Sequence, residues 1–122
     1  MALVRSHGTK PELAVWARID KRRFRYQDSG IAGRPDFSNR ARRLAVFIDG
    51  CFWHGCPVCY RAPKSNRAYW IPKVRRNARR DARVRALLGM AGWRVLRFWE
   101  CQVRRDPGGV ALRMMEEVRA GP

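Results

Sequence analysis

Four cysteines have the number and spacing of a tetrahedral metal site. Cys51, Cys56 and Cys59 fall within nine residues, and Cys101 follows much later in the chain. Four thiolates complete the coordination of a structural zinc ion, and the spacing of the second and third cysteines suits a zinc knuckle. Reduced cysteines also occur in hydrophobic cores, but three in one short loop fit core packing poorly. We therefore predict a structural zinc ion bound by all four cysteines.

One histidine lies inside the same loop. His54 stands between Cys51 and Cys56, and four cysteines already fill a tetrahedral zinc shell without it. An imidazole that titrates near neutral pH is suited to general acid–base catalysis. His54 is therefore a candidate catalytic residue, and a structural role near the zinc or on the surface is the alternative.

Two aspartates lie where strands are expected to begin or end. Asp36 follows a Gly-Arg-Pro turn, and Asp49 ends the apolar run at 44–48. Carboxylates at the ends of neighbouring strands can share a hard cation whose other positions hold water or a phosphate. Aspartates at such places otherwise cap turns. In a chain with 10 acidic and 27 basic residues, the metal-binding interpretation carries more weight.

A third aspartate interrupts the apolar stripe of an expected helix. Steps of three and four residues place Asp81 on one helical face with Val74, Val84 and Leu88. An acid on an apolar face needs a partner. Asp81 therefore pairs either with an arginine or with the imidazole of His54, which a carboxylate would orient and make more basic.

The net charge indicates a polyanionic partner. Lys and Arg number 27 against 10 Asp and Glu, a formal charge of +17, and such an excess binds phosphate backbones by releasing counterions. Hydrophobic residues make up 46% of the chain, which excludes a disordered basic tail. The stretch 61–85 has ten basic residues and one acid. The residues expected to contact DNA phosphates are Lys64, Arg67, Lys73, Arg76 and Arg80.

An aromatic pair adjoins the candidate catalytic histidine. Phe52 and Trp53 lie in the cysteine-containing loop. Exposed aromatic side chains stack on or between bases where DNA is kinked or unstacked. The alternative is that both rings pack around the zinc ion.

The hydrophobic pattern predicts an α/β fold in which helices flank a small mixed sheet. The expected elements are a helix from a capping box at Thr9 to about Lys21, strands at 24–27, from 36 and at 44–48, a basic helix at 66–91, a strand at 93–99 and a helix at 110–119. The first helix is expected to carry Leu13, Trp16 and Ala17 on one face. No repeat or linker divides residues 1–122, so we expect one domain.

Several segments match the motifs of a known enzyme family. They are GRPD at 33–36, VFIDGCFWHGCP at 46–57, YW at 69–70, Asn77 with Arg80 and Asp81, and GWRVLRFWEC at 92–101. These segments closely resemble the very-short-patch-repair (Vsr) DNA mismatch endonucleases, from about Thr9 to Cys101. The resemblance implies a restriction-endonuclease-like PD-(D/E)xK fold with a structural zinc, and nicking of one DNA strand beside a T/G mismatch that arises from deaminated 5-methylcytosine.

The resemblance also implies catalytic roles. Asp36 would be the principal Mg²⁺ ligand, and Ile48 would offer its backbone carbonyl to the same ion. His54 would activate the attacking water. The auxiliary polar residues of the active site would be Glu12, Asp49 and Asp81.

The resemblance extends to the zinc site and to mismatch binding. Cys51 and Cys101 match zinc ligands of the family directly, and Cys56 and Cys59 match an intervening pair whose identity and spacing vary. The Phe-Trp pair at 52–53 resembles the aromatics that wedge into DNA next to the mismatch. An N-terminal arm of residues 1–8 is shorter than is usual in the family, and a C-terminal helix is expected at 102–122.

Together these observations predict a Mg²⁺-dependent endodeoxyribonuclease that acts as a monomer on double-stranded DNA, with repair proteins acting downstream. The chain has no apolar run long enough to span a membrane and no secretory signal at its start, which predicts a cytoplasmic, nucleoid-associated protein of a prokaryote-like cell. One alternative is a related nuclease that cuts matched or modified DNA. Another is a non-catalytic, zinc-stabilised DNA-binding module.

Overall fold

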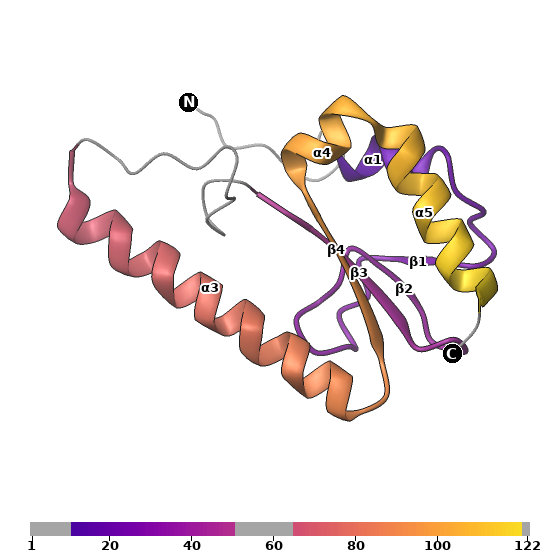
Figure 1. Cartoon of the computed structure of the whole chain (residues 1–122), viewed down its shortest axis with the longest axis horizontal. Helices are drawn as coiled ribbons and strands as arrows, with labels where there is room; N and C mark the ends of the chain where they lie inside the picture. Colours follow the sequence, from indigo (N-terminus) through magenta and orange to yellow (C-terminus); the bar gives the residue numbers. More distant parts are fainter. Residues whose placement is uncertain (1–10, 51–64, 121–122) are drawn as a thin grey trace.

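The computed structural model describes residues 11–50 and 65–120, and in these residues a four-stranded mixed sheet lies between helices (Figure 1). The elements are α1 (Glu12–Trp16), β1 (Arg25–Tyr26), β2 (Phe37–Asn39), β3 (Leu44–Asp49), α3 (Arg67–Met90), β4 (Arg94–Trp99), α4 (Glu100–Arg105) and α5 (Pro107–Ala120). The predicted α/β class with a small mixed sheet is confirmed. None of the helices described here is long and apolar enough to cross a membrane.

The sheet has the order β1-β2-β3-β4. The first two pairings are antiparallel, whereas β3 and β4 run parallel. A parallel pair needs a crossover connection, and α3 lies within that connection. Asp49 lies opposite Trp99 in the register, so β3 and β4 end together at one edge of the sheet.

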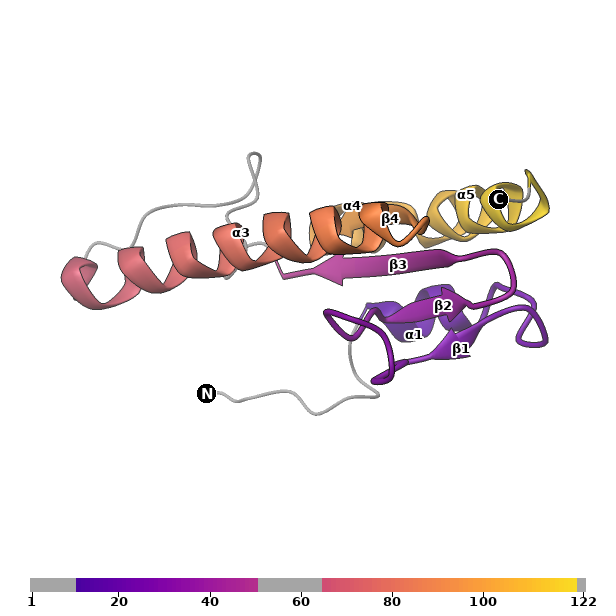
Figure 2. The same cartoon turned by 90° about the horizontal axis from the view of Figure 1, so that it is seen from below.

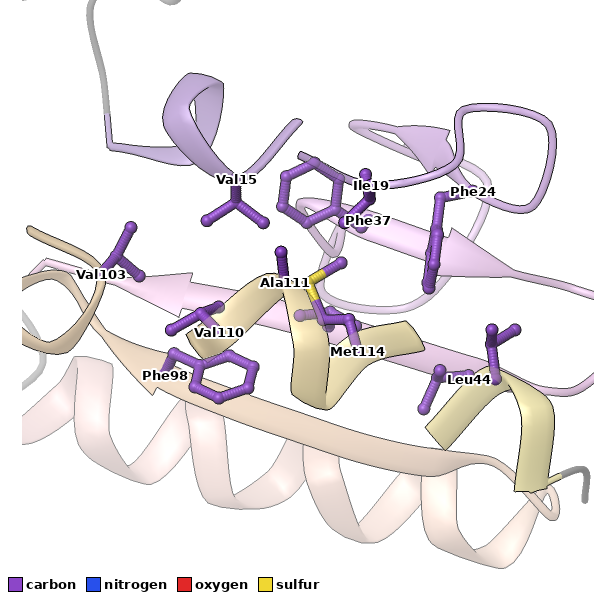
Figure 3. Close-up of a cluster of buried hydrophobic side chains, with 12 residues drawn as sticks. Val15, Ile19, Phe24, Phe37, Leu44, Phe98, Val103, Val110, Ala111 and Met114 are labelled. Carbon is purple, nitrogen blue, oxygen red and sulfur yellow. The ribbon is translucent and has the colours of Figure 1, made fainter. Parts of the chain in front are cut away.

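The main hydrophobic core lies between the sheet and the helices α1, α4 and α5 (Figure 3). Alternate residues of a strand face opposite sides of a sheet, and Leu44, Val46 and Phe98 face this side. The other buried members are Val15, Ile19, Phe24, Phe37, Val103, Val110, Ala111, Met114 and Val118. Most of the buried hydrophobic residues of the described chain belong to this cluster. Because each fully buried aliphatic or aromatic side chain contributes about 1.5–3 kcal/mol, the cluster is the main source of hydrophobic stabilisation.

Helix α3 covers the opposite face of the sheet with a smaller apolar cluster. Ile31, Ala45 and Leu88 are buried there, and Phe47, Val84, Trp93 and Val95 pack against them. The helix is about 36 Å long at 1.5 Å per residue, whereas a six-residue strand covers about 20 Å. Its N-terminal turns therefore extend past the edge at which β3 ends (Figure 2).

The first helix differs from the prediction in its length and in its buried face. Helix α1 begins at Glu12, with Pro11 as its N-cap residue, and ends at Trp16 rather than near residue 21. Its buried residues are Glu12 and Val15. Of the predicted face, Trp16 is partly buried and packs against the core, whereas Leu13 and Ala17 are not among the core residues, because the tertiary packing sets which side of the helix meets α5. Thr9, the predicted N-cap, lies outside the described residues.

The helix predicted at 110–119 is confirmed as α5. The single C-terminal helix expected over 102–122 is wrong, because the described part of that range contains two helices. Helix α4 follows β4 directly, and the Trp99 backbone N–H donates to Gln102 Oε1 at 2.8 Å at its start. Asp106 then separates α4 from α5 and accepts a hydrogen bond from the Gly109 N–H at 2.9 Å. Pro107, which lacks an N–H donor, is the first residue of α5. The break therefore has a local cause that the hydrophobic pattern does not reveal.

Candidate active site

A cleft of about 530 Å³ opens between α3 and the face of the sheet that α3 covers. The turn before β2 forms one of its sides. The described residues that line it are Gly33, Arg34, Asp36, Phe47, Asp49, Arg80, Asp81, Val84, Arg85, Val95 and Arg97. Three aspartates and four arginines thus meet in one hollow. Three of the predicted acids, Asp36, Asp49 and Asp81, are brought together there from the turn before β2, from β3 and from α3.

Asp36 is held at the start of β2 by backbone contacts on both sides. Its carbonyl accepts a hydrogen bond from the Gln27 N–H at 2.7 Å, and its carboxylate Oδ2 accepts one from the Ile48 N–H at 2.7 Å. The turn before it contains two residues of positive φ, Gly33 at +79° and Arg34 at +51°. These contacts fix the carboxylate beside β3.

The environment of Asp36 disfavours its charged form. Burial raises its pKa to about 7, and the negative charges of Glu12 and Asp49 add to the shift, against the opposing effect of the Ile48 N–H. A carboxyl group with such a pKa gains from a cation placed beside it. Strongly perturbed acids in clefts are typical of functional sites.

Glu12 lies on the α1 side of Asp36. It is buried, with 6% of its surface exposed, and it accepts a hydrogen bond from the Tyr26 hydroxyl at 3.4 Å. Burial first, and then the charge of Glu12, raise the pKa of Tyr26 to about 12. The Glu12 carboxylate therefore faces β1, and the sequence analysis did not identify its tyrosine partner.

Arg97 joins the other two acids of the cleft. From β4 it donates to Asp49 Oδ2 through Nε and to Asp81 Oδ2 through a terminal nitrogen at 3.2 Å. Of the two alternatives for Asp81, the structure therefore has the arginine as a partner, whereas His54 lies outside the described residues. An arginine inside an apolar strand was the signal that could have identified Arg97, since a partly buried guanidinium needs acidic partners.

The predicted DNA-binding residues of the described chain lie on α3. Arg67, Arg76 and Arg80 are exposed, and the Lys73 ammonium lies 4.8 Å from the centre of the Tyr69 ring. Arg80 also lines the cleft. Arg85, the last basic residue of the stretch 61–85, and Arg34, which the sequence analysis did not identify as a site residue, add positive charge at the cleft.

The cysteine-containing loop falls outside the described residues. This applies to Cys51, Phe52, Trp53, His54, Cys56 and Cys59, and also to Lys64. Cys101 is described, and it is a partly buried residue in the first turn of α4. Within residues 11–50 and 65–120, no three His, Cys, Asp or Glu side chains gather closely enough to hold a metal ion by themselves.

Comparison with known proteins identifies the family. Residues 1–61 match the family described as DNA mismatch endonuclease Vsr. The chain is 42% identical to the Type II nicking enzyme V.NaeI of Lentzea aerocolonigenes, over 96% of this chain and 75% of that protein. It is 43% identical to the Type II nicking enzyme V.NmeDIP of Neisseria meningitidis serogroup C, over 94% of this chain and 80% of that protein.

A further relative carries the name of the family itself. The chain is 42% identical to the DNA mismatch endonuclease Vsr of Escherichia coli, over 66% of this chain and 53% of that protein. Both the family match and the relatives agree with the resemblance drawn from the motifs. The chain belongs to the Vsr family and is a DNA-nicking endonuclease, a hydrolase of phosphodiester bonds.

Proposed function

We propose that the enzyme nicks one strand of double-stranded DNA at T/G mismatches, by Mg²⁺-dependent hydrolysis at the cleft between α3 and the sheet. The proposal assigns the principal role to Asp36 and has the protein act as a monomer in the cytoplasm. The observation that carries it is the partly buried Asp36 carboxylate, whose pKa is raised to about 7 beside other acids in an arginine-lined cleft.

The oxygen atoms around Asp36 fit a hard divalent cation. In an extended strand the N–H and C=O of one residue point toward the same neighbour. Since the Ile48 N–H points to the Asp36 carboxylate, the Ile48 carbonyl points to the same side, beyond the start of β2. One carboxylate, one carbonyl and water are a normal Mg²⁺ ligand set. Bound there, Mg²⁺ would supply positive charge to the scissile phosphate.

The remaining acid–base work falls to residues of the chain. His54 would accept a proton from the attacking water through an imidazole nitrogen. Asp49 and Asp81 would orient polar groups around the phosphate, and Glu12 would add negative charge behind Asp36. The backbone N–H of Ile48 keeps the Asp36 carboxylate directed at one place, which limits the reorganisation needed during the reaction.

A structural zinc ion is proposed beside the same edge of the sheet. Asp49 and Trp99 are register partners. Cys51 follows the first of them by two residues and Cys101 follows the second by two residues. The two cysteines thus stand at equal distances in sequence after paired strand residues. This supports one site shared by Cys51, Cys56, Cys59 and Cys101, since thiolates are preferred zinc ligands.

DNA binding is assigned to the basic surface of α3 and to the aromatic pair. The N-terminal turns of α3 extend beyond the sheet, so Arg67, Lys73 and Arg76 would contact phosphates away from the cut, and Arg80 would contact phosphates at the cleft. Lys64 would extend this track. Phe52 and Trp53 would stack beside the mismatched pair.

A second candidate function is nicking of a matched recognition sequence. It is favoured by one observation: the relatives aligned over 94–96% of this chain are named Type II nicking enzymes, whereas the relative named mismatch endonuclease aligns over 66%. The two functions differ in substrate and share the catalytic residues.

The deciding experiment is a strand-resolved nicking assay. Labelled duplexes that differ only in one T/G, T/A or C/G pair are incubated with Mg²⁺ or with EDTA. A nick confined to the T/G duplex, dependent on Mg²⁺ and absent with Asp36→Asn, is expected. Equal cutting of all three duplexes would transfer the assignment to the second candidate, and cutting in EDTA would contradict the metal requirement.

A further inference from the structure

One guanidinium connects three elements at the cleft. Arg97 lies on β4, and its side chain is 23% exposed. Its Nε binds Asp49 at the end of β3, and a terminal nitrogen binds Asp81 at the middle of α3. Its guanidinium carbon also lies 4.6 Å from the centre of the Trp99 ring. The side chain is therefore held from three directions.

The planar guanidinium sets the relative position of the two carboxylates. Its N–H donors leave the group in fixed directions within one plane, unlike the freely rotating donors of a lysine ammonium. Two acids from different elements that bind the same guanidinium cannot move independently. Asp49 is fixed to β3, one residue beyond Ile48, which contacts Asp36. Asp81 is fixed to the helix that carries Arg80 and Arg85 into the cleft.

Few apolar side chains hold this part of α3 to the sheet. Val74 and Leu88 are the buried residues of the helix, fourteen positions apart, and between them the partly buried Val84 packs against the smaller cluster. Asp81 lies midway between them, where the cleft separates the helix from the sheet. At that point, the bridge through Arg97 is a polar contact between α3 and β4.

We infer that Arg97 is a positioning residue of the nicking reaction, which aligns the DNA-holding helix α3 with Asp36 through its bridge from Asp49 to Asp81. The inference rests on the proposed function, because it takes Asp36 as the metal-binding acid and α3 as the phosphate-binding helix. Arg97 itself need not touch the reacting phosphate. It acts by keeping the arginines of α3 at a constant distance from the site of cleavage.

The test compares Arg97→Lys and Arg97→Gln with Arg94→Gln. The lysine variant keeps the positive charge and the aliphatic part of the side chain but lacks the planar guanidinium. It still tests the inference if the glutamine variant fails to fold. Arg94 is the matched control, because it lies on the same strand and pairs with Glu117 of α5, away from the cleft, at 3.0 Å. Each variant is assayed on whichever duplex the wild type nicks, for single-turnover rate at saturating DNA, for DNA affinity and for the folded fraction.

We expect Arg97→Lys to nick about 10- to 100-fold more slowly per folded molecule, with DNA affinity changed less than about threefold, because small misplacements reduce the rate rather than the binding. Arg94→Gln should nick at the wild-type rate once corrected for folded fraction. In the double variant Arg97→Lys with Asp81→Asn, the two losses should be less than additive, since both break one bridge.

Three results would overturn the inference: a wild-type rate for Arg97→Lys, a loss explained by the unfolded fraction, or additive losses in the double variant. Asp36→Asn is measured alongside. If Asp36→Asn nicks like the wild type, the proposed function fails. If Asp36→Asn is inactive and Arg97→Lys nicks normally, only the role of Arg97 is refuted.

Discussion

Two aspartates eight residues apart show how the surroundings of a carboxylate decide its use. Asp28 lies in the turn after β1, with 5% of its surface exposed, and Arg40 donates to both of its oxygens at 3.0 and 2.7 Å. Ser38 Oγ and the Gly30 N–H donate to it as well, at 2.8 and 3.1 Å. These donors, with Arg40 first, hold the pKa of Asp28 well below its usual range.

Asp36 has the opposite environment. The Ile48 backbone N–H donates to its carboxylate, and the charges that raise its pKa belong to Glu12 and Asp49. Its pKa therefore rises to about 7, chiefly because of burial. The difference indicates that Asp28 serves the fold. Among the described residues no basic side chain pairs with the Asp36 carboxylate, so a bound cation would compensate its charge.

The largest expected effect is loss of nicking in Asp36→Asn. Removing the charge should reduce the rate by at least about 10³-fold, because a metal-held phosphate contributes several kcal/mol to the barrier and each 1.36 kcal/mol is a factor of ten. The measurement is the single-turnover rate in Mg²⁺. Without metal, above neutral pH, the variant should melt no lower than the wild type, since the substitution removes a buried charge that the site disfavours.

Asp28→Asn is the matched comparison for that variant. It should lower the free energy of unfolding by about 1–3 kcal/mol, because a hydrogen-bonded charge is lost and the partly exposed Arg40 is left unpaired. Urea unfolding measures this loss. The nicking rate per folded molecule should stay at the wild-type value. A rate that falls as far as that of Asp36→Asn would erase the distinction between the two acids.

Stability should depend on pH in opposite directions at the two sites. The folded pKa of Asp36, about 7, lies above the ordinary 3.8, so the stability that its neutral form supplies is complete below the ordinary value and is lost as the pH rises through 7. In metal-free buffer, the wild type should lose about 2 kcal/mol relative to Asp36→Asn between about pH 5 and pH 8. Added Mg²⁺ should reverse this trend by favouring the carboxylate.

The contribution of Asp28 to stability depends on pH with the opposite sign. Its folded pKa is lowered from 3.8, so its stabilisation is present above that value and is lost as the pH falls further. The difference between the wild type and Asp28→Asn should be constant near neutral pH and should shrink below about pH 4. Urea unfolding curves across this pH range measure the free energy of unfolding of each variant relative to the wild type. If this difference changed with pH in the same direction for Asp28→Asn and Asp36→Asn, the opposite pKa shifts of the two acids would be contradicted.

The smallest expected effects distinguish the glycines beside the two acids. A Cβ on Gly33, at φ +79°, would lie 2.6 Å from Val84 Cγ1 and 3.2 Å from the Phe47 ring. Gly33→Ala should therefore destabilise the fold by about 1–2 kcal/mol. It should also slow nicking, because it pushes α3 away from the sheet.

Gly30→Ala is the control for this substitution. A Cβ there would lie 2.6 Å from the end of the Arg40 side chain, which can move. Its effect on stability should be below about 1 kcal/mol, with no change in nicking per folded molecule. Thermal melts and single-turnover rates compare the two, and equal rates for both alanine variants would show that the turn before Asp36 tolerates the displacement.

The order of the main elements was predictable from local patterns. Local hydrophobic patterns predicted three of them: an apolar run for β3, a second such run for β4 and a basic helix for α3. Each of these patterns involves residues that are close together in the sequence. The acids Asp36 and Asp49 were recognisable as candidate site residues because Asp36 follows a turn at the start of a strand and Asp49 ends an apolar run. The cysteines and the histidine were likewise recognisable in the sequence as candidate zinc-binding and catalytic residues. The loop that carries most of them lies outside the described residues.

The tertiary structure decided which charges meet. The sequence did not show that Arg40 binds Asp28. It also did not show that, among the described residues, the Asp36 carboxylate is bound by the Ile48 N–H and not by an arginine. The bridge of Arg97 joins residues 16 and 48 positions away, and the buried side of α1 depends on α5. Secondary structure is set by short-range backbone preferences, whereas a carboxyl pKa and an ion pair depend on distances between remote segments, so only the folded chain determines them.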